Sequence, residues 1–238
     1  TGAGSGIGRE ITKSIINKGG IVAGVDLRRD GLTELKNELG AHSDSLSIHE
    51  ASVADKEAVQ AIAKQIINEH GHVDGLINNA GIIQPFVKIN DLDYDTIDRV
   101  MGVNFYGTVY MLKAFLPEML KRPAAHIVNI SSMGGFLPVP GQSIYGASKA
   151  AVKLMTEGLQ SELIGTNVSA TVVFPGATST NITKNSGVKS PISEQDAKNS
   201  KIPSQSPQAV ASLVVQAIEK NIPRVYAGDR KSTRLNSS

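Results

Sequence analysis

Segments with the character of β-strands alternate along this chain with longer segments that have helical periodicity. Six strands are expected, at 21–26, 46–53, 75–78, 126–131, 168–174 and 224–227. Helices are expected between them, at 7–18, 55–69, 95–120, 143–163 and from 206 to about 220. Because strand–helix–strand units of this length place their strands side by side in parallel, the pattern predicts an α/β protein. Its expected form is a doubly wound parallel sheet with helices on both faces, in a single domain.

The composition excludes several classes of protein. Hydrophobic residues make up 40% and charged residues 19% of the 238 residues, as in a folded globular chain. The absence of cysteine excludes disulfides and thiolate metal sites, and with them a metal-dependent alcohol dehydrogenase. A net charge of +2 gives no concentrated basic surface for nucleic acid. No apolar run is long enough for a membrane and no signal peptide opens the chain, so a cytoplasmic location is expected.

No metal is expected from the histidines either. His70 and His72 lie too close together in the sequence to form a ligand pair on one face of a helix. They are expected at a solvated helix end.

The first eight residues, T-G-A-G-S-G-I-G, open the first expected helix. Gly2, Gly6 and Gly8 permit a tight turn and a close approach of the backbone to a pyrophosphate. The free N–H groups of the helix terminus would bind the phosphates. Since the spacing differs from that of the commonest dinucleotide-binding sequence, a plain glycine-rich loop remains the alternative.

Asp26 ends the strand that follows this turn. A carboxylate at that place bonds the hydroxyls of an adenosine ribose and repels a 2′-phosphate, so NAD is expected and NADP is less favoured. Arg28 and Arg29 follow closely and could partly offset the repulsion. The alternative is that Asp26 is only a turn residue.

Tyr145 and Lys149 are four residues apart in an expected helix, so the phenol and the ammonium share one face. A cation about 4 Å from a phenol is worth about 4 kcal/mol at an effective dielectric near 20, which lowers the phenol pKa by about three units. A tyrosine and a lysine at this spacing are common in helices that have no chemical role. Ser132 follows the strand at 126–131, where its hydroxyl could hold a substrate oxygen beside the phenol. The group as a whole predicts proton transfer by Tyr145.

These motifs together resemble the short-chain dehydrogenase/reductase family over nearly the whole chain, from about Thr1 to Gly228. The matching segments are T-G-x-x-x-G-x-G at 1–8, N-N-A-G at 78–81, asparagine at 104, serine at 132, Y-x-x-x-K at 145–149, and P-G at 175–176 with threonine at 180. The resemblance implies a Rossmann-like fold and an oxidoreductase that transfers a hydride between NAD(H) and an alcohol or ketone. It also implies a homodimer or homotetramer, formed through the long helices at 95–120 and 143–163.

The resemblance assigns roles to individual residues. Tyr145 would donate or accept the proton, and Ser132 would orient the substrate oxygen. Lys149 would bind the nicotinamide ribose and lower the tyrosine pKa, with Asn104 supporting a water that links Lys149 to solvent. The implied catalytic residues are therefore Asn104, Ser132, Tyr145 and Lys149. The implied cofactor-binding residues are Gly2, Ser5, Gly6, Ile7, Gly8, Asp26, Ser52, Val53, Asn79, Ala80, Gly81, Tyr145, Lys149, Pro175, Gly176, Thr178 and Thr180.

Two further roles follow from the family. Asn78 would stabilise the central strand region, and Thr180 would bond the nicotinamide carboxamide. Ser52 departs from the pattern, because many relatives carry an aspartate near the adenine at that place. Ser52 can still form a hydrogen bond.

The first strand of the family's sheet is the larger departure. In the family that strand is central, and this chain begins at Thr1, inside the turn that follows it. Its neighbours would lose a pairing partner, so we expect poor folding and about six or more additional N-terminal residues. At the other end, the polar segment 230–238 is expected to be a non-native tail, with a natural flexible tail as the alternative. The expected catalytic domain is 1–229.

Other readings remain open. A non-catalytic cofactor-binding protein usually lacks the tyrosine, lysine or serine, and a sugar-nucleotide epimerase or dehydratase usually carries a larger C-terminal domain. The segment 183–206 is expected to be a mobile lid over a small-molecule substrate, or else an idle surface loop. An apolar substrate pocket with a polar contact, or ordinary packing, would account for Met133, Phe136, Leu137, Val139, Ile144 and Gln142.

Overall fold

The computed structural model describes residues 1–188 and 204–228. Its strands are β1 (Val22–Asp26), β2 (Leu46–Glu50), β3 (Gly75–Asn78), β4 (Ala125–Ile130), β5 (Val168–Pro175) and β6 (Arg224–Ala227). Its helices are α1 (Gly6–Ile16), α2 (Arg29–Glu38), α3 (Lys56–His70), α4 (Tyr94–Met101), α5 (Gly107–Met119), α6 (Ser143–Glu162), α7 (Ile182–Asn185) and α9 (Pro207–Lys220). All six expected strands are present, and the strand pairs of the described residues are parallel, which confirms the predicted α/β class.

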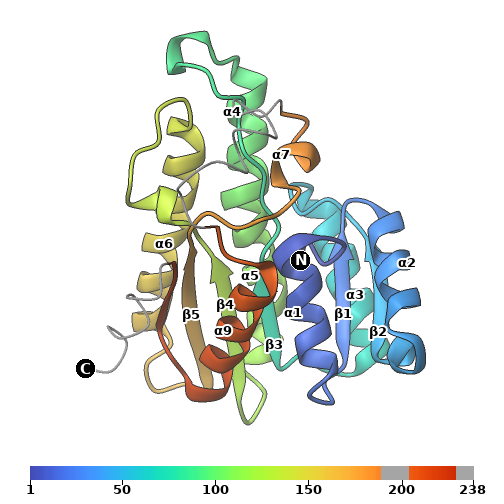
Figure 1. Ribbon diagram of the computed structural model, residues 1–238. Coiled ribbons are helices and arrows are strands. Elements are labelled where there is room, and N and C mark those ends of the chain that lie inside the picture. Colours follow the sequence, from blue (N-terminus) through green and yellow to red (C-terminus); the bar gives the residue numbers. More distant parts are fainter. Residues whose placement is uncertain (189–203, 229–238) are drawn as a thin grey trace.

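Helices cover both faces of the strands (Figure 1). α1 and α9 pack together on one face, over a buried cluster that includes Ile11, Val128 and Val214. α3, α5 and α6 cover the other face, where Ile66, Phe115 and Ile127 are buried. The apolar run of β4 is buried along its whole length, as expected for a central strand covered on both sides.

Two helical features differ from the prediction. α2 was not expected from the sequence, because only Leu32 and Leu35 of its ten residues are buried. The expected helix at 95–120 is interrupted by a π-helical turn at Gly102–Tyr106, which separates α4 from α5. The start of α3 agrees with the prediction. Asp55 caps this helix by accepting a hydrogen bond from Ala58 N at 2.9 Å.

The strands form two separate sheets in the described part of the chain, β1–β2 and β3–β4–β5–β6. Between β1 and β3 lies a cavity of about 650 Å³, lined mainly by apolar side chains of α1, β1 and β3. In the described part of the chain, the peptide groups of β1 and β3 that face this cavity pair with no strand.

Backbone hydrogen bonds of Thr1 and Ala3 reach both sheets at this place. The Thr1 ammonium donates a hydrogen bond to Ile77 O at 2.8 Å, and Ala3 N donates to Val25 O at 3.2 Å. Burial lowers the pKa of the Thr1 amine from 8.0 to about 6.

Some expectations fall outside the described residues. The tail at 230–238 and residues 189–203 of the expected lid belong to this group. None of the described helices combines the length and apolar character that crossing a membrane requires.

Candidate active site

The glycine-rich turn lies at the carboxyl edge of the strands, where α1 begins. Gly2 and Gly6 have φ of +64° and +54°, a region that glycine enters without strain. A Cβ on Gly8 would lie 2.2 Å from Gly2 O, so the helix contacts the turn as closely as a glycine allows. The turn therefore has a compact backbone without side chains at these three positions.

The segment 78–81 lies against this turn. Thr1 Oγ1 accepts hydrogen bonds from Asn79 N and Ala80 N, both at 3.0 Å, and Asn79 Nδ2 donates to Thr1 O at 3.0 Å. Asn78 points the other way and donates to Asn129 Oδ1 at 2.9 Å, joining β3 to β4. The structure thus brings together two motifs that are almost 80 residues apart in the sequence.

Asp26 lies on the other side of the turn. Its carboxylate accepts hydrogen bonds from Gly4 N at 2.9 Å and from Arg28 N at 3.1 Å. The Arg28 guanidinium donates to Asn185 Oδ1 at 2.7 Å, and Asn185 Nδ2 donates to Ser5 Oγ at 3.0 Å. Asp26 is therefore held at the end of β1 in contact with the turn, and α7 closes over Ser5.

Thr180 completes this part of the site. A Cβ on Gly6 would lie 3.3 Å from Thr180 Cγ2, so the threonine after β5 reaches the start of α1. Pro175 is buried at the end of β5, and Thr178 Oγ1 donates to Gly176 O at 3.0 Å. Ile7 is half-buried in the first turn of α1.

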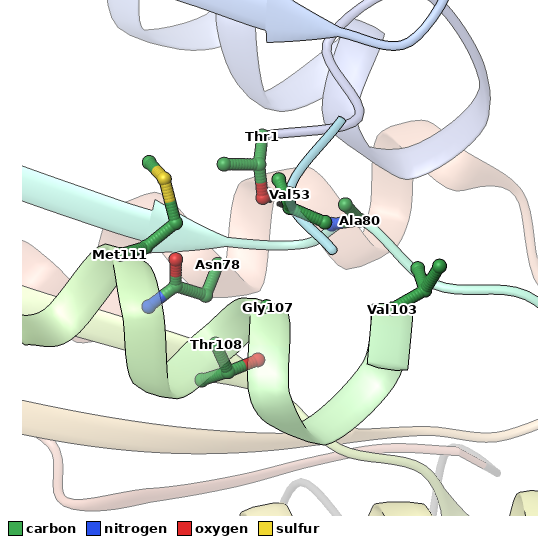
Figure 2. A pocket seen from close by; sticks show the side chains of 8 residues that line it. All are labelled: Thr1, Val53, Asn78, Ala80, Val103, Gly107, Thr108 and Met111. Atoms are coloured by element: carbon green, nitrogen blue, oxygen red, sulfur yellow. Dashed lines mark hydrogen bonds between the residues drawn. The ribbon is translucent and has the colours of Figure 1, made fainter. Parts of the chain in front are cut away.

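Ser52 and Val53 lie in the loop after β2. Ser52 Oγ accepts a hydrogen bond from Ala54 N at 3.3 Å. The Val53 side chain faces inward, and Figure 2 shows it with Thr1, Ala80 and Gly107 around a pocket that has no room for a water molecule. A Cβ on Gly107 would lie 2.8 Å from Val53 Cγ2. Since its side chain is packed in the interior, Val53 can contact a ligand only through its backbone.

Tyr145 lies in the first turn of α6, beside Ser132. Burial raises the pKa of the Tyr145 phenol, and a hydrogen bond with the Ser132 side chain partly opposes this. Ser132 Oγ also accepts from Gly134 N at 3.0 Å, which fixes the hydroxyl at the end of β4. Gly134 keeps the space open, since a Cβ there would lie 3.3 Å from Tyr145 Cε1.

Lys149 is buried one helical turn further along α6. Its Nζ donates a hydrogen bond to Ile130 O at 2.9 Å, and burial lowers its pKa from 10.5 to about 8. A Cβ on Gly81 would lie 3.1 Å from Lys149 Nζ, so the glycine leaves room for the ammonium. The expected lowering of the Tyr145 pKa is not found in this structure, because desolvation of the phenol raises the pKa more than the Ser132 hydrogen bond lowers it.

Asn104 lies in the π-helical turn and is fully buried. Its side chain accepts from Ile82 N at 2.8 Å and donates to Ile82 O at 3.0 Å and Ser148 Oγ at 2.9 Å. The turn in the helix directs this amide toward α6, and such π-turns are frequent at functional sites. Asn104 therefore contacts the segment after Gly81 directly.

Sequence reasoning missed Gln84, which is also fully buried. Its Oε1 accepts from Ile144 N at 2.8 Å and Tyr145 N at 3.0 Å, and its Nε2 donates to Gly141 O at 2.9 Å. The side chain thus satisfies N–H groups at the start of α6 that have no partner within the helix. Only its position a few residues after the N-N-A-G segment could have drawn attention to it.

The residues expected to line a substrate pocket lie in different surroundings. Gln142 is buried and donates its Nε2 hydrogen bond to Gln84 O at 2.8 Å, so it supports Gln84 instead of facing a substrate. Phe136, Leu137 and Val139 are exposed beside Ser132. Phe136 packs against Phe174 with ring centroids 4.5 Å apart.

Comparisons with known proteins agree with this geometry. A family model described as short chain dehydrogenase matches residues 1–190. The oxidoreductase SadH of Mycobacterium tuberculosis is 36% identical over 238 residues, which cover 96% of this chain and 84% of that protein.

Solved structures are similar as well. A short-chain dehydrogenase/reductase from Burkholderia phymatum in complex with NAD has a TM-score of 0.84 and 29% identity, covering 95% of this chain and 85% of that one. The closed form of a serine dehydrogenase complexed with NADP⁺ also has a TM-score of 0.84 and 29% identity, covering 94% and 91%. These neighbours therefore include complexes with both nucleotides.

Proposed function

The chain belongs to the short-chain dehydrogenase family of oxidoreductases, and from this premise we propose that it interconverts an alcohol and a ketone with Tyr145 as the proton-transferring group. The observation that carries the proposal is the shared position of Tyr145, Ser132 and Lys149 with the glycine-rich turn. All four lie where β-strands reach their carboxyl ends, the edge at which ligands bind in such sheets.

The turn and its neighbours would hold the cofactor. Gly2, Gly6 and Gly8 present bare backbone to the phosphates, and the residues from Asn79 to Gly81 continue that surface toward Lys149. When bound, the nicotinamide supplies the hydride acceptor or donor, while the protein supplies position and charge.

The side chains then divide the remaining work. Ser132 Oγ would hold the substrate oxygen by a hydrogen bond while Tyr145 exchanges a proton with it. In the oxidation direction the hydroxyl proton passes to the Tyr145 oxygen as the C–H bond breaks and the C=O bond forms. In the reduction direction the phenol gives the proton back to the carbonyl oxygen.

The charge state of the site fits reduction as it stands. Because burial raises the Tyr145 pKa, the phenol carries its proton at neutral pH and can donate it. Oxidation requires a lower phenol pKa, and the positive charge of an oxidised nicotinamide would act in that direction.

We further propose that NAD is the preferred cofactor. The Asp26 carboxylate is fixed beside the turn by Gly4 N and Arg28 N, in the place where an adenosine ribose would lie. A 2′-phosphate there would meet a negative charge. Arg28 is already bonded to Asn185, so it is not free to neutralise that phosphate without giving up this contact.

A homo-oligomer is proposed from the exposed apolar side chains on the long helices. Leu154 of α6 is 69% exposed, and Tyr106, just before α5, is 49% exposed. Burial of these side chains in a symmetric interface would be favourable. Light scattering on the purified protein would measure the mass of the oligomer directly.

The decisive experiment uses the Tyr145→Phe variant. It removes one hydroxyl and should abolish the NAD-linked conversion of alcohols and ketones while NAD still binds, as measured by calorimetry. Tyr110→Phe, on α5, is a matched control and should keep full activity. Near wild-type turnover in Tyr145→Phe would refute the proposed role. A folded protein that binds NAD but converts none of the alcohols or ketones tested would favour a non-catalytic binding protein.

A further inference from the structure

Two histidines and a glutamate meet where the end of α3 reaches β2. His49 lies in β2, and Glu69 and His70 are the last two residues of α3. Among the described residues, these three side chains form the group of potential metal ligands whose nitrogen and oxygen atoms all lie within 4.8 Å of one another. β2 and α3 lie side by side at one end of the molecule (Figure 1).

The distances are close to those of a coordination sphere. His49 Nε2 is 3.8 Å from Glu69 Oε2, and His70 Nε2 is 3.9 Å from Glu69 Oε1. Ligand atoms of a tetrahedral zinc ion at about 2.1 Å lie roughly 3.4 Å apart, so small movements would suffice. Both imidazole Nε2 atoms are also 2.8 Å from Ser47 Oγ, so they already point toward one another.

We propose that His49, Glu69 and His70 form a binding site for a divalent transition-metal ion such as Zn²⁺. Two imidazole nitrogens and one carboxylate are a ligand set that zinc accepts, with water in the open position. Ser47 Oγ stands between the two imidazoles, and an ion there would replace its two hydrogen bonds.

The surroundings give an ion a protected site with a way in. The His49 side chain is 2% exposed, so its ring is held in place by the interior. The Glu69 side chain is 45% exposed, which gives an ion a path from solvent.

The structure also limits the affinity. Metal-bound histidines usually donate their second N–H to an acceptor, and the buried Nδ1 of His49 has no partner. Arg29 adds a nearby positive charge. We therefore expect weaker binding than at a structural zinc site, and no dependence of folding on the metal.

The test is calorimetric titration of the whole chain with zinc chloride in a buffer that does not bind metal. We expect one ion per chain, a higher melting temperature with zinc that a chelator reverses, and visible absorption of tetrahedral cobalt when Co²⁺ replaces Zn²⁺. Glu69→Gln and His70→Ala should each weaken binding by about tenfold to a hundredfold.

His72→Ala is the matched control, because His72 lies two residues beyond His70 and faces Asp74 at 3.3 Å. It should bind zinc as the wild type does. The absence of binding at millimolar zinc, or equal weakening by His72→Ala and His70→Ala, would overturn the proposal. The Glu69→Gln, His70→Ala and His72→Ala variants all keep the buried His49. The test therefore does not depend on a variant that fails to fold.

Discussion

Gln84 Oε1 accepts hydrogen bonds from the backbone N–H groups of both Ile144 and Tyr145, at 2.8 and 3.0 Å. A side chain from the loop after β3 thus fixes the first turn of the helix that carries the proposed acid. We infer that Gln84 positions Tyr145 without touching the substrate.

Gln84→Met should therefore reduce kcat by about tenfold to a hundredfold, because an error of about 1 Å in a reacting group can cost this much. The two orphaned N–H groups should also cost about 2 kcal/mol or more of folding free energy. NAD affinity should change little, which steady-state kinetics and calorimetry can separate. Full kcat in a folded Gln84→Met protein would exclude the positioning role.

Lys149→Met should stabilise the protein at neutral pH while it abolishes turnover. The Lys149 pKa is lowered from 10.5 to about 8 by burial, so the folded state disfavours the charged form. Its contribution to stability is unfavourable below pH 8, by roughly 3 kcal/mol, and improves as pH rises toward 10.5. Melting curves of the variant and the wild type should therefore converge at high pH. A variant that is less stable at pH 7 would show that the bond to Ile130 O outweighs the desolvation.

Gly8→Ala should weaken NAD binding, since its Cβ would lie 2.2 Å from Gly2 O. The turn has to shift, and overpacking of this kind costs about 1–3 kcal/mol. Gly158→Ala in α6 is the matched control, because a Cβ there meets no atom within 4 Å. It should leave binding unchanged and add about 0.5–1 kcal/mol of stability. Calorimetric titration with NAD compares the two variants. Equal affinities for NAD would contradict the proposal that the glycine-rich turn binds the cofactor.

Asp26→Asn should shift the cofactor preference toward NADP. It removes a negative charge and keeps the size of the side chain, so the ratio of kcat/KM for NADP to that for NAD should rise about tenfold or more. Asp30→Asn makes the same charge change at an exposed place nearby in α2 and should leave the ratio unchanged. An unchanged ratio in Asp26→Asn would mean that Asp26 holds the glycine-rich turn and has no part in the choice of cofactor.

The cavity between β1 and β3 gives a prediction about stability. Six apolar β-forming residues added ahead of Thr1 should fill it, pair with both strands and replace the buried amine by an amide. Burial of two large side chains is worth about 3 kcal/mol or more, which raises the Tm of a chain of this size by roughly 6–12 °C. A Gly-Ser extension of equal length is the control. Equal Tm values for both would show that the cavity does not accept a strand.

The sequence by itself determined where the strands lie along the chain, their parallel arrangement and the motifs of the site, because periodicity and residue type act locally. Tyr145, Ser132 and the three glycines were predicted from such local patterns. α2 was missed because only two of its side chains are buried, and the π-helical turn at Asn104 leaves no distinct local signal.

Only the tertiary structure decided what surrounds each of these groups. The approach of Gln84 to α6, the meeting of His49 with His70, and the raised pKa of Tyr145 all depend on contacts between residues far apart in the chain. The pKa of a buried group reflects the sum of desolvation and nearby charge at one point in space, and spacing along a sequence does not fix that sum. The helix face shared by Tyr145 and Lys149 was therefore predictable, whereas the charge state of the phenol was not.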